Sequence, residues 1–198
     1  MDSREFSEFR LVGGTSLSLQ IGHRMSVDID LFTDATYGSI DFETIDDFLI
    51  SQFSYVDTSF GILPGMGRSY LIGADKDHSI KLDIFYTTED FIKEPVIEEG
   101  IRMATVEDII AMKVDVISRG GRKKDFWDLH ELLNDYPIAQ MLALHEKRSP
   151  YNHVRESIIN NFRDFAEADY DFEPLCLRGK HWELIKLDFL EALEKAGL

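Results

Sequence analysis

Two aspartates separated by one residue are the most chemically informative feature of this 198-residue sequence. Asp28 and Asp30 alternate with the apolar residues Val27, Ile29 and Leu31, as expected for a strand with one apolar face. Adjacent carboxylates on one face repel each other, unless the edge is solvated or a divalent cation lies between them. The pair therefore indicates either a solvated strand edge or metal-dependent phosphate chemistry.

A glycine turn precedes this strand. Gly13 and Gly14 let the backbone approach a ligand closely, and Thr15 is a candidate N-cap of a helix whose free N–H groups would face an anion. Alone, either the diglycine or the D-x-D pattern is more often a surface feature. Their order in one short segment favours a site that binds phosphate.

A third carboxylate lies on the polar face of another expected strand. In the segment from Ile80 to Tyr86 the apolar residues face one way, while Lys81 and Asp83 face the other. We therefore predict that Asp28, Asp30 and Asp83 form one metal cluster across neighbouring strands.

The elements that would position these residues can be read from periodicity. The spacing predicts a helix over 41–52, strands over 53–60 and 69–72, and a turn-rich connection over 61–67. After a polar stretch that contains Pro95, the pattern becomes helical, and the helices beyond Pro137 are expected to serve packing. We expect two domains, a sheet-containing core over 1–98 and a helical domain over 99–198.

A lysine interrupts the apolar stripe of the first helix in the second half. This helix is expected to begin after Thr105, and Lys113 occupies the stripe position between Ile110 and Val114. The side chain either extends its ammonium into water, with only the stem packed, or faces a cleft where it meets a phosphate.

An aspartate interrupts the stripe of the next helix in the same way. Asp125 precedes Leu129 and Leu132 at helical spacing, and the glycine-containing turn from Arg119 to Arg122 would bring it toward Lys113. Asp125 either faces the same cleft as Lys113 or stabilises the first turn of its own helix.

Composition limits the partners. The chain is 44% hydrophobic with one cysteine, and it has neither a membrane-spanning apolar run nor a signal peptide, so we expect a cytoplasmic protein. A formal net charge of −16 argues against a surface that grips nucleic acid throughout. Any RNA contact must be local, and the basic cluster is Arg119, Arg122, Lys123 and Lys124. The histidines show no paired metal-ligand spacing.

Three pieces of the sequence together resemble a known family, the AbiEii/AbiGii-type nucleotidyltransferase toxins of bacterial abortive-infection and toxin–antitoxin systems. These pieces are the segment from Leu11 to Phe32, the strand around Lys81 and Asp83, and the region from Ala111 to Leu129. They occur in the family's order and cover about residues 9–133.

The resemblance implies an α+β fold with a polymerase-β-like nucleotidyltransferase sheet, flanking helices and a C-terminal helical bundle. It implies that two Mg²⁺ ions are held by Asp28, Asp30 and Asp83, and that Lys113 and Asp125 complete the catalytic set. The nucleotide-binding residues that it implies are Gly13, Gly14, Thr15, Arg24, Ser26, Lys81 and Lys113.

Three functions remain open at this point. The first is a toxin that transfers a nucleotide from an NTP to RNA, above all tRNA, or to a protein, and that is paired with a winged-helix antitoxin. On this hypothesis the basic cluster and Arg24 would form the rim that faces RNA. The second is an antibiotic-modifying type of enzyme that acts on a small molecule. The third is a catalytically silent nucleotide-binding protein of the same fold, which the presence of all three carboxylates disfavours.

Overall fold

The computed structural model describes residues 1, 3–58 and 65–198, and the chain forms two compact units. The first comprises residues 1–16 and 27–104, and the second comprises 17–26 and 105–198. The division differs from the expected one at 98/99, because that point lies inside the hairpin of β6 (Val96–Glu98) and β7 (Ile101–Met103). The segment 17–26 also joins the helical unit instead of the sheet.

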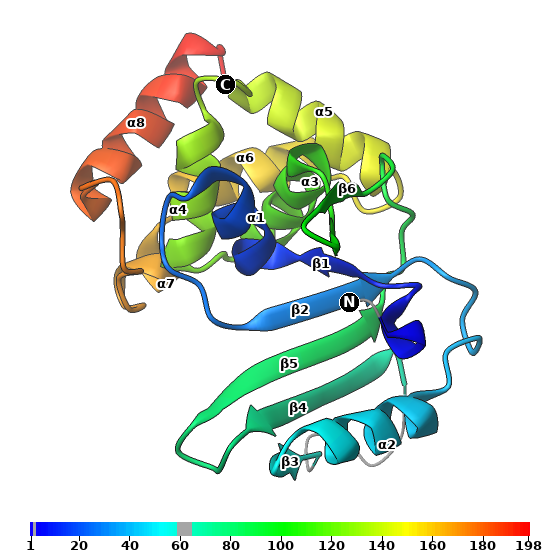
Figure 1. The fold of residues 1–198 in the computed structure, drawn as a ribbon. Coiled ribbons are helices and arrows are strands. Elements are labelled where there is room, and N and C mark those ends of the chain that lie inside the picture. The colour runs from blue at the N-terminus through cyan, green and yellow to red at the C-terminus, as the bar shows by residue number, and fades with distance from the viewer. Residues whose placement is uncertain (2, 59–64) are drawn as a thin grey trace. The chain divides into compact units, whose positions relative to one another are not determined.

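A seven-stranded mixed sheet forms the centre of the first unit, in the order β3-β4-β5-β2-β1-β7-β6 (Figure 1). The remaining strands are β1 (Arg10–Val12), β2 (Ile29–Thr33), β3 (Tyr55–Asp57), β4 (Gly67–Gly73) and β5 (Ser79–Tyr86). β2 is parallel to β5 and antiparallel to β1. The last residues of the strand expected over 53–60 and most of the 61–67 turn lie outside the described residues.

One face of this sheet carries the core of the first unit. Helix α2 (Phe42–Gln52) is capped by Asp41, whose side chain accepts hydrogen bonds from the backbone N–H groups of Glu43 and Thr44. Together with the short helix η1 (Arg4–Phe6), α2 contributes apolar side chains to a cluster with alternate residues of the strands, and Figure 1 shows it running along β4. The strand residues between them point to the opposite face.

The second unit is a bundle of helices. They are most of α1 (Gly13–Ile21), then α3 (Val106–Ile117), α4 (Lys123–Leu132), α5 (Ile138–Arg148), α6 (Arg155–Arg163), α7 (Ala166–Asp169) and α8 (Trp182–Lys195). The ring of Phe126 on α4 contacts those of Phe162, Phe165, Trp182 and Phe189. Within the described part of the chain, no helix is long and apolar enough to cross a membrane.

Candidate active site

Asp30 and Asp83 lie directly side by side on neighbouring parallel strands. They are register partners of β2 and β5, and so their side chains share the face opposite the core residues Leu31 and Ile84. One oxygen of Asp83, Oδ2, lies 2.5 Å from the Lys81 ammonium. The other, Oδ1, is buried and has no hydrogen-bond partner among the described residues. A buried carboxylate oxygen without a partner is costly, which makes it a suitable position for a cation ligand.

The glycine turn approaches the same carboxylates. Gly13 has a φ of 68°, and a Cβ atom built there would lie 2.6 Å from Oδ2 of Asp30. Only glycine fits this conformation and this contact without a shift of Asp30. Gly14 is buried beside it.

Thr15 has a different role from the expected one. Helix α1 begins at Gly13, so Thr15 lies in the first turn instead of at the cap. Its hydroxyl donates a hydrogen bond to the backbone carbonyl of Asp28, which is half-buried and directly precedes β2. The start of α1 is therefore tied to the segment that carries the first aspartate.

Carboxylate oxygens, including an Asp83 Oδ1 without a hydrogen-bond partner in the described part of the chain, suit a hard divalent cation such as Mg²⁺. In residues 1, 3–58 and 65–198, however, no three His, Cys, Asp or Glu side chains are placed together to hold a metal ion. Asp30 and Asp83 are brought together by register, whereas a cluster of all three carboxylates stays a prediction.

The two polar residues that interrupt the helical stripes meet inside the second unit. Nζ of Lys113 lies 2.5 Å from Oδ1 of Asp125 and 2.8 Å from Oδ2 of Asp128, and the lysine is only 6% exposed. The ammonium is thus not extended into water. Burial alone would lower the pKa of Lys113, but Asp128 and Asp125 raise it above its ordinary value, so the side chain stays charged.

Asp125 pairs with Lys113 and also stabilises the first turn of its own helix. Its Oδ1 pairs with Lys113, while its Oδ2 accepts a hydrogen bond of 3.0 Å from the backbone N–H of Arg122 at the start of α4. Burial would raise the pKa of Asp125, but the charge of Lys113 holds it below the usual range. The carboxylate is therefore ionised, with both oxygens engaged.

Asp128 is the residue that sequence reasoning missed. It is fully buried, and besides Lys113 it contacts Nε2 of His23 at 2.7 Å and Nε and Nη2 of Arg24 at 2.6 and 2.9 Å. Burial would raise its pKa, but Lys113 and Arg24 lower it far below the ordinary value. Its position one residue from the Leu129 stripe gave a signal, because an acid so close to a buried face needs partners.

Two members of the predicted RNA-facing rim need correction. Arg24 is 4% exposed and engaged by Asp128, and Lys123 is 5% exposed, with its ammonium 5.5 Å from the centre of the Trp182 ring. Neither forms an exposed basic rim, because the guanidinium and the ammonium are buried with partners. Arg119 and Arg122 have exposed side chains, and Ser26 is half-buried.

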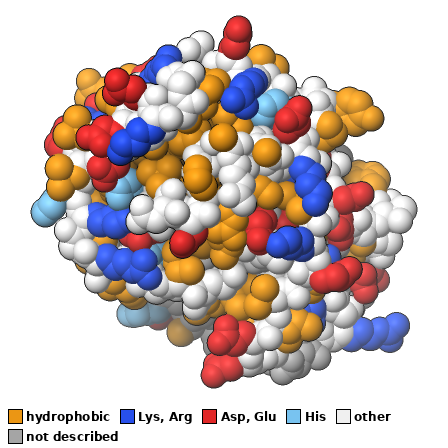
Figure 2. Space-filling model, turned by 90° about the horizontal axis from the view of Figure 1, so that it is seen from above, with side chains coloured by type: hydrophobic (Ala, Val, Ile, Leu, Met, Phe, Trp, Pro, Cys, Tyr) orange, Lys and Arg blue, Asp and Glu red, His pale blue; other side chains and the backbone are white. Residues whose placement is uncertain are grey.

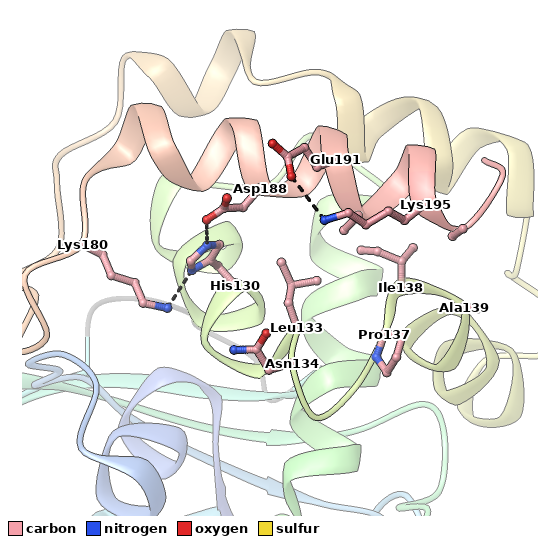
Figure 3. A pocket seen from close by; sticks show the side chains of 12 residues that line it. His130, Leu133, Asn134, Pro137, Ile138, Ala139, Lys180, Asp188, Glu191 and Lys195 are labelled. Carbon is pink, nitrogen blue, oxygen red and sulfur yellow. Dashed lines mark hydrogen bonds and ion pairs between the residues drawn. The ribbon is translucent and has the colours of Figure 1, made fainter.

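The second unit also contains a cavity of about 560 Å³ between α4, the start of α5 and α8 (Figure 3). His130 lies at one end, within 2.8 Å of both Lys180 and Asp188. The residues lining it include none of the predicted site residues, all of which the structure describes. We therefore do not place the chemistry there.

Comparisons with known proteins agree with this architecture. An Aquifex aeolicus protein that is itself uncharacterized is 28% identical over 91% of this chain and 84% of its own length. The Helicobacter pylori protein JHP933 has the same fold, with a TM-score of 0.61 and 19% identity over 96% of this chain and 84% of that one. MenT4, a nucleotidyltransferase toxin of Mycobacterium tuberculosis, matches with a TM-score of 0.54 and 14% identity over 94% and 75% of the two chains.

A family model covers nearly the whole sequence. The model described as nucleotidyl transferase AbiEii toxin, type IV toxin–antitoxin system, matches residues 1–196. The predicted nucleotidyltransferase sheet with flanking helices and the predicted enzyme class are thereby confirmed. The chain belongs to the AbiEii nucleotidyltransferase toxin family.

Proposed function

We propose that this nucleotidyltransferase moves a nucleotide from an NTP to a hydroxyl of an RNA acceptor, above all tRNA, and that a winged-helix antitoxin counteracts it. The observation that carries the proposal is the register pairing of Asp30 with Asp83 on one face of the sheet, with Gly13 pressed against Asp30. This arrangement provides adjacent carboxylates next to a glycine turn, as phosphate chemistry with a divalent cation requires.

In this proposal Asp28, Asp30 and Asp83 hold two Mg²⁺ ions. Bound there, the metals would supply charge stabilisation to the attacking and leaving oxygens. The chain's own contribution is mainly positioning. The hydrogen bond from Thr15 to the Asp28 carbonyl fixes the start of α1 relative to the aspartate strand, so that Gly13, Gly14 and Thr15 can present backbone N–H groups to phosphate oxygens.

The remaining residues predicted to bind the nucleotide have different contacts in the structure. Lys81 pairs with Asp83, so we assign it to the phosphates that gather beside that carboxylate. Lys113 is paired with Asp125 and Asp128 inside the helical unit, and its role toward the triphosphate is part of this proposal. Arg24 and Ser26 lie in the segment that precedes Asp28, and the ion pair between Arg24 and Asp128 fixes this segment. We assign both residues to nucleotide binding through the position of this segment.

The charge of the protein surface bears differently on the two candidate acceptors, RNA and a small molecule. In the face drawn in Figure 2, lysine and arginine side chains are interspersed with acids, consistent with the formal net charge of −16. An RNA acceptor therefore requires a local binding surface, for which Arg119 and Arg122 are the exposed members of the basic cluster. The acidic composition is the observation that favours a small hydroxyl compound as the second candidate.

A labelling assay tests the proposal directly. The protein is incubated with Mg²⁺ and each labelled NTP, and with either total bacterial tRNA or an aminoglycoside as acceptor. We expect label on tRNA, reduced about 100-fold or more in Asp30→Asn, as for the loss of a charge-stabilising group. The matched control is Asp77→Asn, an exposed acid in the turn between β4 and β5.

The acceptor decides between the two candidates. Label on the aminoglycoside with none on tRNA, and no growth defect when the chain is expressed without an antitoxin, would overturn the RNA proposal. Transfer to tRNA that survives Asp30→Asn unchanged would overturn the assignment of the site instead.

A further inference from the structure

An aromatic pair lies on the same face of the sheet as the two paired carboxylates. Phe32 and Phe85 are the next register partners along β2 and β5 on that face, two residues beyond Asp30 and Asp83. Their ring centres are 6.2 Å apart with the planes at 63°, and both side chains are half-buried. They are separate from the hydrophobic cluster on the α2 face.

Neighbouring strands fix the position of this pair. Gly67 is the β4 partner of Phe85, and a Cβ atom there would lie 2.6 Å from the Phe85 ring, so the ring lies against a strand position without a side chain. Arg10 is the β1 partner of Phe32, and its guanidinium stacks 4.2 Å from the centre of the Phe91 ring. Aromatic rings beside an arginine are the components of surfaces on which nucleobases stack.

The residues of this face follow a fixed order along the strands. Because β1 is antiparallel to β2 and pairs Val12 with Asp30, the glycine turn after Val12 lies toward Asp28. Thr15 confirms this direction through its hydrogen bond to the Asp28 carbonyl. Phe32 and Phe85 lie in the opposite direction, so the carboxylates separate the glycine turn from the aromatic pair.

This order distinguishes the two substrates. In an in-line displacement the attacking hydroxyl approaches from the side opposite the leaving pyrophosphate. If the triphosphate lies on the glycine turn, which rests on the function proposed above, the aromatic pair is on the side of the acceptor. We propose that Phe32 and Phe85 stack the terminal nucleobase of a single-stranded nucleic acid acceptor and so present its hydroxyl to Asp30 and Asp83.

The dimensions suit this role. Two strand residues span roughly 6.6 Å, so the rings lie about one nucleoside away from the carboxylates. Stacking recognises any base, because every base has a π face, so this subsite tolerates different terminal sequences. Arg10 is the register partner of Phe32, so its positive charge lies beside the stacked base, where the phosphodiester next to the terminal nucleoside of the acceptor would be placed.

The test measures binding with a fluorescent base and needs no turnover. One probe is a single-stranded RNA hexamer with 2-aminopurine at its 3′ end, and the other is 2-aminopurine riboside triphosphate with Mg²⁺. The full chain is compared with Phe32→Leu, Phe85→Leu and the conservative Phe85→Tyr. Phe48→Leu is the matched control, since Phe48 is a partly buried aromatic packed on the opposite, α2 face.

We expect the hexamer's fluorescence to be quenched on binding. Each leucine variant should weaken hexamer binding about 5- to 150-fold, the range for loss of one base–aromatic stack, with binding retained in Phe85→Tyr and Phe48→Leu. The triphosphate probe should bind the leucine variants as tightly as the unmodified chain. Unchanged triphosphate binding by the leucine variants excludes a general folding defect.

Two results would overturn the inference. Weakened binding of the triphosphate, with the hexamer unaffected, would assign the pair to the base of the NTP. Unquenched hexamer, or an equal loss in Phe48→Leu, would show that the rings only pack the sheet. If the unmodified chain transfers label to tRNA while the hexamer is unquenched, this inference fails and the proposed function stands. If the hexamer is quenched but no label is transferred to RNA, the stacking inference stands and the proposed function fails.

Discussion

Replacing Asp128 by asparagine should destabilise the helical unit strongly while changing its shape very little. Four nitrogen atoms from His23, Arg24 and Lys113 lie within 2.6–2.9 Å of the Asp128 oxygens. The asparagine Oδ1 can replace the oxygen that faces His23 and Nε of Arg24. Its amide NH₂, however, would face two further donors, Nη2 of Arg24 and Nζ of Lys113, where aspartate offers an acceptor.

The size of the effect follows from the charge balance. Arg24 and Lys113 carry two positive charges against the two negative charges of Asp125 and Asp128, all of them at most 6% exposed. Asp128→Asn leaves one buried positive charge uncompensated, which costs about 3–5 kcal/mol. Adding Lys113→Met restores neutrality, so we expect the double variant to be less destabilised than the sum of the single variants by about 0.5–3 kcal/mol.

Urea unfolding followed by tryptophan fluorescence measures this, because Trp127 and Trp182 are both buried in the helical unit. The control is Asp188→Asn, whose side chain is 53% exposed and contacts His130, and it should cost less than about 1 kcal/mol. A loss below about 1 kcal/mol in Asp128→Asn, or strict additivity with Lys113→Met, would refute the view that this network is a closed set of charges.

Three further outcomes are expected. Gly13→Ala should abolish nucleotide transfer because its Cβ would lie 2.6 Å from Oδ2 of Asp30, whereas Gly22→Ala, with a φ of 60° and nothing within 4 Å, should keep activity and bear only a backbone cost of about 1–2 kcal/mol in unfolding free energy. Because the pKa of Asp128 is lowered in the folded state, its contribution to stability is full above about pH 5 and is lost as the pH falls below its ordinary pKa of 3.8. The stability difference between the unmodified chain and Asp128→Asn should therefore shrink in acid, and a difference independent of pH would contradict the assigned charges. Phe126→Ala removes a ring with four aromatic neighbours and should lower the unfolding free energy by about 3–5 kcal/mol in urea titration, against under about 0.5 kcal/mol for Phe172→Ala, whose side chain is 91% exposed.

Local periodicity was enough to predict some of this structure. Alternation placed Asp30 and Asp83 on polar strand faces, and the interrupted helical stripes identified Lys113 and Asp125, which do meet. The pairing of Lys113 with Asp125 could be predicted because a charged residue at a core-facing position is rare unless it has a partner.

The remaining features depend on contacts between distant parts of the chain. Asp128 binds Arg24 across 104 residues of sequence, and no local pattern indicates that pairing. For the same reason Arg24 was expected at an exposed rim and is buried. The register that aligns Phe32 with Phe85 likewise required the parallel pairing of β2 with β5.

The interleaving of the two units sets the order in which the protein can fold during synthesis. Residues 17–26 belong to the helical unit, yet the whole of 27–104 is translated before the rest of that unit begins. At roughly 5–20 residues per second, His23 and Arg24 wait on the order of 5–20 s for Asp128 to leave the ribosome. A fragment of residues 105–198 would likewise lack His23 and Arg24, the second of which also forms a β-bridge with Cys176. Proteolysis or truncation after Ala104 would therefore divide the polypeptide without releasing either unit intact, and only a permuted chain that joins 17–26 to the later helices would do so.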